Sequence, residues 1–249
     1  MGMLEGHVAI VTAAAGAGIG QATARRFAEE GAEVVITDAH ARRVEETADA
    51  LRKEFGRDFL GLEVDVTNVE QVNSMVRAAL DRYGRIDTLV NNAARNILSP
   101  VRDLPDETWH TVINVCLNGT FYCTRAVLPP MLERKTGKIV NLASVVGWEA
   151  AVDQAAYASA KAGIMAFTRA VAAEVAGAGI RVNAVAPSFS PNPFLERIYP
   201  KEMLEAFERR EMFGRGADPG EIANVILFLV SDLSSYMTGE VLSVSSQHP

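Results

Sequence analysis

Short apolar runs alternate along the chain with longer segments in which apolar residues recur every three to four positions. The runs are typical of buried strands, and the longer segments are typical of amphipathic helices. The runs predict strands at His7–Thr12, Glu33–Thr37, Phe59–Val64, Ile86–Val90, Lys138–Leu142, Ile180–Val185 and Glu240–Val244. The longer segments predict helices at Gln21–Glu30, Ala41–Phe55, Asn68–Tyr83, Pro105–Lys135, Gln154–Ala176, Lys201–Phe213 and Pro219–Ser231.

Prolines interrupt this pattern at two places. Pro129 and Pro130 predict a break near the end of the fourth helix, because proline has no backbone N–H to donate. The stretch Pro187–Pro200 contains four prolines and shows no regular period, so we expect a loop there.

The order of these elements predicts the fold class. Strands separated mostly by helices pair in parallel through right-handed crossovers. A count of seven strands favours an open sheet over an eight-unit barrel. No change of composition marks a linker, so we expect residues 1–249 to form one domain. The prediction is a Rossmann-type, doubly wound, parallel seven-stranded α/β sheet with helices on both faces.

Composition and charge exclude several classes of protein. The chain has 249 residues, 49% of them hydrophobic, and a net charge of −7 from 24 basic and 31 acidic side chains. A disordered chain is excluded, and the acidic balance argues against a nucleic acid or an anionic membrane as partner. No apolar run approaches the roughly 20 residues of a membrane-spanning helix, and no signal peptide is evident. We therefore expect a cytoplasmic protein that acts on a small molecule.

Metal binding is not expected. Cys116 and Cys123 are too few for a zinc site by themselves. The four histidines have no ligand spacing: His7, His40, His110 and His248.

Glycines follow the first predicted strand and lead into the first helix. Gly16, Gly18, Ile19 and Gly20 occupy this turn, where backbone N–H groups and the helix dipole favour a diphosphate. Glycines at this spacing also occur in simple turns, and Gln21 breaks the Gly-x-Gly-x-x-Gly fingerprint. The position between a strand and a helix is what favours a dinucleotide.

Asp38 ends the second predicted strand, about 20 residues beyond the glycines. An acidic side chain at this place binds the adenosine ribose hydroxyls and repels a 2′-phosphate, which favours NAD. Arg42 and Arg43 lie close in sequence and would suit the phosphate of NADP instead. We expect NAD, with NADP as the alternative.

Tyr157 and Lys161 are four residues apart in a predicted helix and therefore share one face. A nearby ammonium lowers the pKa of a phenol, which would let Tyr157 exchange a proton with an alcohol or ketone oxygen. Ser144 follows the fifth strand at the carboxyl edge of the sheet, where ligands bind in such folds. Its hydroxyl is a candidate for holding the substrate oxygen.

Together these residues resemble the short-chain dehydrogenase/reductase family over nearly the full chain. The matching pieces are VTAAAGAGIG (Val11–Gly20), DV (Asp65 and Val66), NNAA (Asn91–Ala94), Ser144, YASAK (Tyr157–Lys161) and VNAVAP (Val182–Pro187). Members that act on 3-oxoacyl, hydroxysteroid or 3-hydroxyacyl-CoA substrates are the nearest in pattern. The resemblance implies a homo-oligomer, usually a tetramer packed through its two long helices.

The resemblance also implies the roles of individual residues. Tyr157 would be the general acid/base, Lys161 would bind the nicotinamide ribose and lower the phenol pKa, and Ser144 would orient the carbonyl. The cofactor would further contact five residues, with adenine held by the first two: Asp65, Val66, Asn91, Asn92 and Pro187.

The chain departs from the family pattern at four places, one of them the segment SVSSQHP (Ser243–Pro249), where many relatives have Asp-Gly-Gly. Ala13 replaces a glycine after Thr12, and the turn is one residue longer. Cys116 takes the place of the family's catalytic asparagine, whose main chain helps to hold a water in a proton relay. Asn192 stands where the family has a threonine that meets the cofactor.

By family analogy, residues 188–214 would form a lid over the substrate, and this segment is rich in apolar side chains. Trp148 is a further candidate for the pocket wall, and Arg95 would either face an anionic group or lie in solvent. We expect a bulky apolar ketone or secondary alcohol, such as a steroid-derived ring ketone or a 3-hydroxyacyl thioester. The alternative is a catalytically weak or inactive member that binds a dinucleotide or acts as a scaffold, for which Cys116 and the altered turn are the best arguments.

Overall fold

The apolar runs form one parallel sheet with the strand order β3-β2-β1-β4-β5-β6-β7. This computed structural model describes residues 2–246. The strands are β1 (Val8–Val11), β2 (Glu33–Asp38), β3 (Leu60–Glu63), β4 (Thr88–Asn91), β5 (Gly137–Leu142), β6 (Ile180–Pro187) and β7 (Val241–Val244). The seven-stranded, doubly wound single domain expected from the sequence is confirmed. His248 lies outside the described residues.

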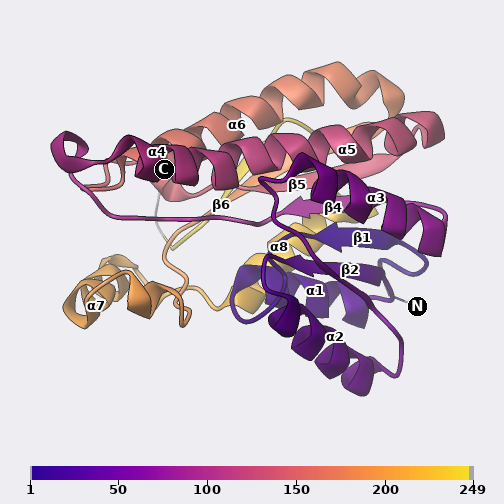
Figure 1. Ribbon diagram of the computed structural model, residues 1–249, viewed down its shortest axis with the longest axis horizontal. Helices are drawn as coiled ribbons and strands as arrows, with labels where there is room; N and C mark the ends of the chain where they lie inside the picture. Colours follow the sequence, from indigo (N-terminus) through magenta and orange to yellow (C-terminus); the bar gives the residue numbers. More distant parts are fainter. Residues whose placement is uncertain (1, 247–249) are drawn as a thin grey trace.

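Helices cover both faces of the sheet (Figure 1). They are α1 (Ile19–Glu29), α2 (Ala41–Phe55), α3 (Val69–Tyr83), α4 (Asp106–Ile113), α5 (Gly119–Arg134), α6 (Ala155–Val175), α7 (Lys201–Arg210) and α8 (Pro219–Val230). Because successive strand residues point to opposite faces, Ala9 and Val11 pack with α1, α2 and α8. Ile10 packs on the other face with α3, α5 and α6. No helix of residues 2–246 has the length and apolar character needed to cross a membrane.

The predicted break at Pro129 and Pro130 is wrong, since α5 runs through both prolines to Arg134. Each proline removes one backbone donor from the helix, and buried Val127 and Met131 hold its last two turns against the sheet. The irregularity lies earlier, where a π-helical turn at Asn114–Asn118 joins α4 to α5. This turn places Cys116 in the protein interior.

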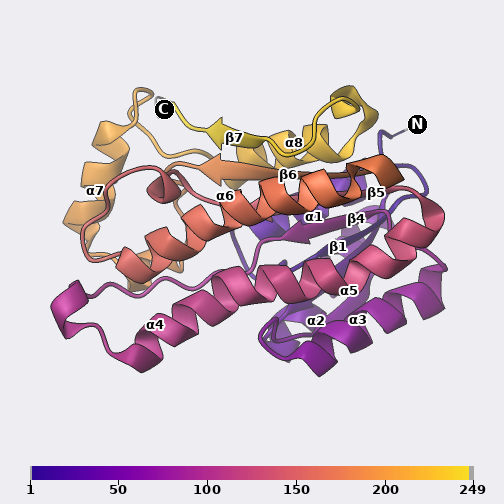
Figure 2. The ribbon, with the colours of Figure 1, turned by 90° about the horizontal axis from the view of Figure 1, so that it is seen from above.

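The order of the strands reverses direction between β1 and β4, so the crossovers diverge at the carboxyl edge of these two strands. Such a reversal leaves a crevice where ligands of doubly wound folds bind. The strand arrows point toward the side of the molecule where α7 lies, and Figure 2 shows α7 beyond the ends of β6 and β7. The segment 188–214 therefore lies at the same edge as the loops that follow the strands.

A chain of buried hydrogen bonds ties α6 to the middle of the sheet. Asn91 Nδ2 donates to Asn141 Oδ1 over 2.8 Å and to Thr124 Oγ1 over 3.0 Å. Asn141 Nδ2 donates in turn to Thr168 Oγ1 on α6 over 2.9 Å. Asn91 and Asn141 are register partners on β4 and β5, so the same contacts fix the strand pair and the helix.

Asp87 forms a buried ionic contact just before β4. Its carboxylate accepts hydrogen bonds from Arg85 Nε and Nη2 at 2.7 and 2.6 Å and from Val8 N at 3.0 Å. Arg134 lies 3.4 Å away. Burial raises the pKa of this carboxyl group, but Arg85, the Val8 N–H and Arg134 outweigh it and hold the pKa below its ordinary value.

We expect Asp87→Asn to lower the free energy of unfolding by about 2–4 kcal/mol at pH 7, because it removes the charge that two arginines face. Because the pKa of Asp87 is lower in the folded than in the unfolded chain, ionised Asp87 stabilises the fold. This stabilisation is fully present above the carboxyl pKa of the unfolded chain, near 4. That contribution is lost as the pH falls through the lower pKa of the folded state. Denaturant titrations at pH 7 and in strong acid measure the difference, which should shrink in acid.

The matched control is Asp103→Asn, which breaks an exposed pair with Arg102. An exposed pair contributes little to stability. Equal effects of the two substitutions would contradict the importance assigned to Asp87.

Candidate active site

The segment between β1 and α1 forms a cradle of backbone groups. Gly16 and Gly18 have φ angles of 102° and 104°, which glycine adopts without strain. A Cβ atom on Gly20 would lie 2.4 Å from both Ala13 O and Asn92 Nδ2, so the close approach requires glycine. The start of α1 has no side-chain cap and no acidic residue in its first turn. The free N–H groups and the shape of the cradle fit a diphosphate.

Contacts from the end of β4 hold this cradle in place. The backbone N–H groups of Asn92 and Ala93 donate to Thr12 Oγ1 at 2.9 and 3.0 Å. Asn92 Nδ2 donates to the carbonyl oxygens of Thr12 and Ala13 at 2.9 and 3.0 Å. Ile19 opens α1 and packs against the core below the turn. Asn91, in contrast, points into the core between α5 and α6 and not toward the cradle.

Asp38 ends β2 beside the cradle and is buried. Its Oδ1 accepts hydrogen bonds from His40 N at 3.1 Å and from Arg43 Nη2 at 3.0 Å. Burial raises the pKa of this carboxyl group, while Arg43 and the N–H groups of Ala15 and Ala39 oppose that effect. Arg43 is thus bound to Asp38, and the bond from Ala15 joins Asp38 to the glycine turn.

Ser144, Tyr157 and Lys161 come together where β5 meets α6. Ser144 follows β5 and precedes a short turn of helix at Val145–Gly147, and its Oγ accepts a hydrogen bond from Val146 N at 3.3 Å. Lys161 Nζ lies 5.4 Å from the centre of the Tyr157 ring. The same Nζ donates to the carbonyl oxygen of Leu142, the last residue of β5. The structure thus brings these three side chains to one edge of the sheet.

The electrostatics of this group differ from the expectation that Lys161 lowers the phenol pKa. Burial raises the pKa of Tyr157 well above its ordinary value; Cys116 and Tyr199 raise it further, and a hydrogen bond with Ser144 lowers it. Burial also lowers the pKa of Lys161, whose ammonium group bonds to a carbonyl and not to the phenol. Loss of solvent therefore dominates both groups, and the phenol is protonated at neutral pH.

Cys116 lies in the π-helical turn and bonds to the loop after β4. Its Sγ accepts a hydrogen bond from Arg95 N and donates to Arg95 O, both at 3.3 Å. Ala156 and Ala160 of α6 pack in the same buried cluster. The thiol therefore joins the π-helical turn to the loop after β4, which runs beside Tyr157. This contact helps to position the turn and the loop relative to each other.

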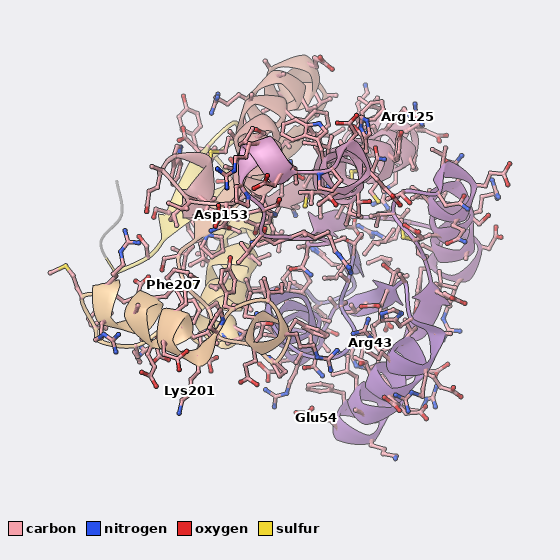
Figure 3. The ribbon with its side chains drawn as sticks, turned by 60° about the vertical axis from the view of Figure 1, so that its left-hand side comes forward. Arg43, Glu54, Arg125, Asp153, Lys201 and Phe207 are labelled. Carbon is pink, nitrogen blue, oxygen red and sulfur yellow. The ribbon has the colours of Figure 1, made fainter. Side chains whose placement is uncertain are left out.

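The segment 188–214 reaches back to the cradle. The Phe194 ring lies 5.2 Å from the Arg43 guanidinium carbon, and a Cβ on Gly16 would lie 3.4 Å from the same ring. Asn192 lies beside Gly18. A Cβ atom added to Gly18 would lie 3.8 Å from the Cβ atom of Asn192. Figure 3 shows α7 and Arg43 of α2 in one view. This segment therefore lies against the glycine turn and against Arg43, the partner of Asp38.

The remaining candidates follow β3 or end β6, at the carboxyl edge of the sheet. Val66 is buried, and a Cβ on Gly119 would come within 2.6 Å of its Cγ2. Asp65 is exposed and accepts hydrogen bonds from the N–H and hydroxyl of Thr67. Pro187 ends β6 opposite Val244. Within residues 2–246 no three His, Cys, Asp or Glu side chains gather as metal ligands.

Sequence patterns missed one cluster at this edge. Asn96, Gln154 and Tyr199 form hydrogen bonds with one another, although Gln154 is 58 residues from Asn96 and 45 from Tyr199. Each was an ordinary polar residue in a loop, and no spacing rule connects such distant positions. Trp148 is 42% exposed and so is at most a partial wall of a pocket.

Comparisons with known proteins identify relatives of the whole chain. A family model described as enoyl-(acyl carrier protein) reductase matches residues 13–246. The (5R,7aS)-5-hydroxy-7a-methyl-1-oxo-2,3,5,6,7,7a-hexahydro-1H-indene-carboxyl-CoA reductase of Mycobacterium tuberculosis is 48% identical over 255 residues, covering 100% of this chain and 95% of the relative. The (2S)-[(R)-hydroxy(phenyl)methyl]succinyl-CoA dehydrogenase subunit of Thauera aromatica is 42% identical over 241 residues, covering 97% and 96%. A crystal structure of a short chain dehydrogenase from Mycobacterium smegmatis has a TM-score of 0.88 and 46% identity, covering 100% of this chain and 95% of that one.

We expect Ala13→Gly to stabilise the protein, because Ala13 has a φ of 49° in the left-handed region. An alanine there costs about 1 kcal/mol that glycine avoids. For a chain of this size the melting temperature should rise by about 2–4 °C. Thermal unfolding followed by circular dichroism measures it.

Ala50→Gly is the opposed control, because Ala50 lies exposed within α2. Glycine destabilises an ordinary helix interior by about 1 kcal/mol. A fall in melting temperature for both variants would show that Ala13 is not strained.

Proposed function

This chain belongs to the short-chain dehydrogenase/reductase family, and we propose that it interconverts a ketone and a secondary alcohol with NAD as its cofactor. The observation that carries the proposal is the meeting of Ser144, Tyr157 and Lys161 at the carboxyl edge of β5. A phenol, an ammonium group and a hydroxyl at such an edge provide the proton and the positioning that carbonyl reduction needs.

The residues of this chain supply the proton chemistry, and a bound nicotinamide would supply or accept the hydride. Tyr157 is protonated at neutral pH, so its phenol is ready to donate a proton to a carbonyl oxygen that is gaining charge. Ser144 lies close enough to Tyr157 to share a hydrogen bond, and its hydroxyl would orient the same oxygen. Lys161 would leave Leu142 O to hold the ribose and stabilise the phenolate after proton transfer.

The cradle described above supports the binding of a dinucleotide. We assign the diphosphate to the turn formed by Gly16, Gly18, Ile19 and Gly20. Asp38 would accept hydrogen bonds from the adenosine ribose, and its carboxylate disfavours a 2′-phosphate. This is the reason for preferring NAD to NADP, since Arg43 is bound to Asp38.

The rest of the cofactor would lie along the crevice. Asp65 and Val66 would border adenine, and Pro187 would border the nicotinamide. We propose that Asn92 supports the cofactor by holding the glycine turn, while Asn91 stabilises the central strands from within the core.

For the substrate we propose a bulky, mainly apolar ketone or secondary alcohol, either a ring ketone or a 3-hydroxyacyl thioester. Aromatic rings gather on the segment 188–214, which we propose as the substrate lid: Phe207 packs against Phe189 at 5.6 Å and against Tyr199 at 5.2 Å. Both curated relatives named above have CoA thioesters in their names, one of them with a fused ring. These names support a thioester that carries a ring or a branched chain.

We also propose a cytoplasmic homo-oligomer, in keeping with the family. Trp109 on α4 and Phe121 on α5 are 36% and 38% exposed, which leaves apolar surface on the first of the two long helical segments that would pack together.

A second candidate is a dinucleotide-binding member with weak or no turnover. The replacement of the usual asparagine by Cys116 favours it, because the relay through this turn is altered. Against it, Cys116 still bonds to Arg95 and so keeps the turn in place. Binding of NADH without turnover of acetoacetyl-CoA or of a ring ketone such as decalone would favour this candidate.

We expect Tyr157→Phe to lower kcat by about 10²–10⁴-fold, the usual contribution of a general acid. Binding of NADH, measured by fluorescence titration, should remain, because the ring and its packing are kept. Turnover of acetoacetyl-CoA with NADH gives the rate. A variant as active as the wild type would exclude Tyr157 as the proton donor.

We expect Asp38→Asn to shift the ratio of the NADPH and NADH dissociation constants by about tenfold or more toward NADPH. The substitution removes the like charge that a 2′-phosphate would meet, a repulsion that typically costs several kcal/mol. Fluorescence titration with both dinucleotides measures the ratio. Glu46→Ala is the control, since Glu46 is an exposed carboxylate on the same helix as Arg43. An unchanged ratio for Asp38→Asn would place the ribose elsewhere.

A further inference from the structure

Three polar side chains from distant segments meet beside Tyr157. Asn96 Nδ2 donates to Gln154 Oε1 and to Tyr199 Oη, both at 2.9 Å. Tyr199 Oη donates to Gln154 Oε1 at 3.2 Å. Asn96 belongs to the loop after β4, Gln154 precedes α6, and Tyr199 precedes α7. The cluster therefore connects the proposed lid to two loops of the core.

Gln154 and Tyr199 are buried, Asn96 is half-buried, and the cluster has apolar support. Tyr199 is 8% exposed, and its ring packs edge-on against Phe207 of α7. A backbone bond of 2.9 Å from Ser99 N to Asp153 O joins the two core loops next to it. Figure 3 labels Asp153 and Phe207, which come from the core side and the α7 side. Phe207 of the proposed lid therefore packs against the ring of Tyr199, while Asn96 and Gln154 of the core bind its hydroxyl group.

The cluster also adjoins the reacting position. Gln154 is three residues before Tyr157 in sequence, and Tyr199 is close enough to Tyr157 to influence its titration. A link between lid and core at this point bears directly on how a substrate sits against Tyr157.

One buried polar atom of the cluster has no partner. Asn96 Oδ1 accepts no hydrogen bond, although both donors of its amide group are directed at Gln154 and Tyr199. Buried polar atoms are seldom left unpaired, because an unpaired one loses its hydrogen bonds to water without replacement. A hydroxyl or amide N–H of a substrate would satisfy this oxygen.

We propose that Asn96, Gln154 and Tyr199 form a polar latch that holds the lid over Tyr157, with Asn96 Oδ1 as acceptor for a substrate donor. The substrates that fit are ketones or alcohols with a hydroxyl or an amide N–H within about six bonds of the reacting carbon, which is the position of the first pantetheine amide in a 3-oxoacyl thioester of CoA. The latch deepens the proposed function and rests on it for the identity of the substrate. Tyr199 is in this view a positioning residue, while Asn96 determines specificity.

Tyr199→Phe tests the latch, because it removes the hydroxyl and keeps the ring against Phe207. With acetoacetyl-CoA and NADH as the probes, we expect KM for acetoacetyl-CoA to rise by at least about three- to tenfold, because the lost hydroxyl makes two hydrogen bonds, each of which typically contributes about threefold or more. The dissociation constant of NADH should stay within twofold. Tyr236→Phe is the matched control, because the Tyr236 side chain is fully exposed.

Hydrogen exchange of the backbone amides in residues 194–213 gives a readout that needs no substrate. We expect faster exchange there in Tyr199→Phe than in the wild type or in Tyr236→Phe. Asn96→Leu should raise KM in the same way, and the double variant should be no worse than the poorer single one, because both remove one linked unit.

The two readouts separate failure of the latch from failure of the proposed function. Unchanged exchange and an unchanged KM in Tyr199→Phe would overturn the latch while reduction of acetoacetyl-CoA still stands. If the wild type binds NADH but does not reduce acetoacetyl-CoA, faster exchange in Tyr199→Phe would support the lid contact alone and overturn the substrate part of the proposal.

Discussion

The hydrogen bonds that run from Asn91 through Asn141 to Thr168 hold together the parts on which the site depends. They are buried, so their replacement by water would require the sheet and α6 to separate. They fix the register of β4 against β5 and hold α6 in a fixed position on the sheet. Because Tyr157 and Lys161 stand on α6 and Ser144 follows β5, this one chain of contacts sets their mutual positions.

A second set of contacts performs the same task for the cradle. Thr12 and Asn92 join the end of β1 to the end of β4, at the place where the strand order reverses. The turn is one residue longer than the family pattern and contains Ala13 with a positive φ. Its backbone is nevertheless pinned by the Asn92 amide and by Asp38, which also bonds to the turn. The altered sequence therefore retains a cradle that can receive a diphosphate.

Burial governs the chemistry of the group around Tyr157. Lys161 Nζ donates to the carbonyl oxygen of Leu142 and not to the phenol of Tyr157. Loss of solvent therefore raises the pKa of Tyr157 and lowers the pKa of Lys161. Both shifts reduce the charge inside the site. The protonated phenol is in the form that can donate a proton to a carbonyl oxygen. Cys116 stands where the family has an asparagine. It contributes to the position of this group indirectly, because its thiol bonds to the backbone of Arg95.

Hydrophobic period and residue spacing were sufficient to predict the seven strands, the single domain, the glycine turn and the face shared by Tyr157 and Lys161. These features are local, or follow from rules of strand and helix order that hold throughout this fold class. The continuation of α5 through Pro129 and Pro130 was decided by the packing of Val127 and Met131, which a local rule does not include. The pairing of Arg43 with Asp38 and the meeting of Asn96, Gln154 and Tyr199 also required the tertiary structure. The members of that cluster lie on separate loops, and only the assembled sheet and the path of the 188–214 segment bring their side chains within hydrogen-bonding distance.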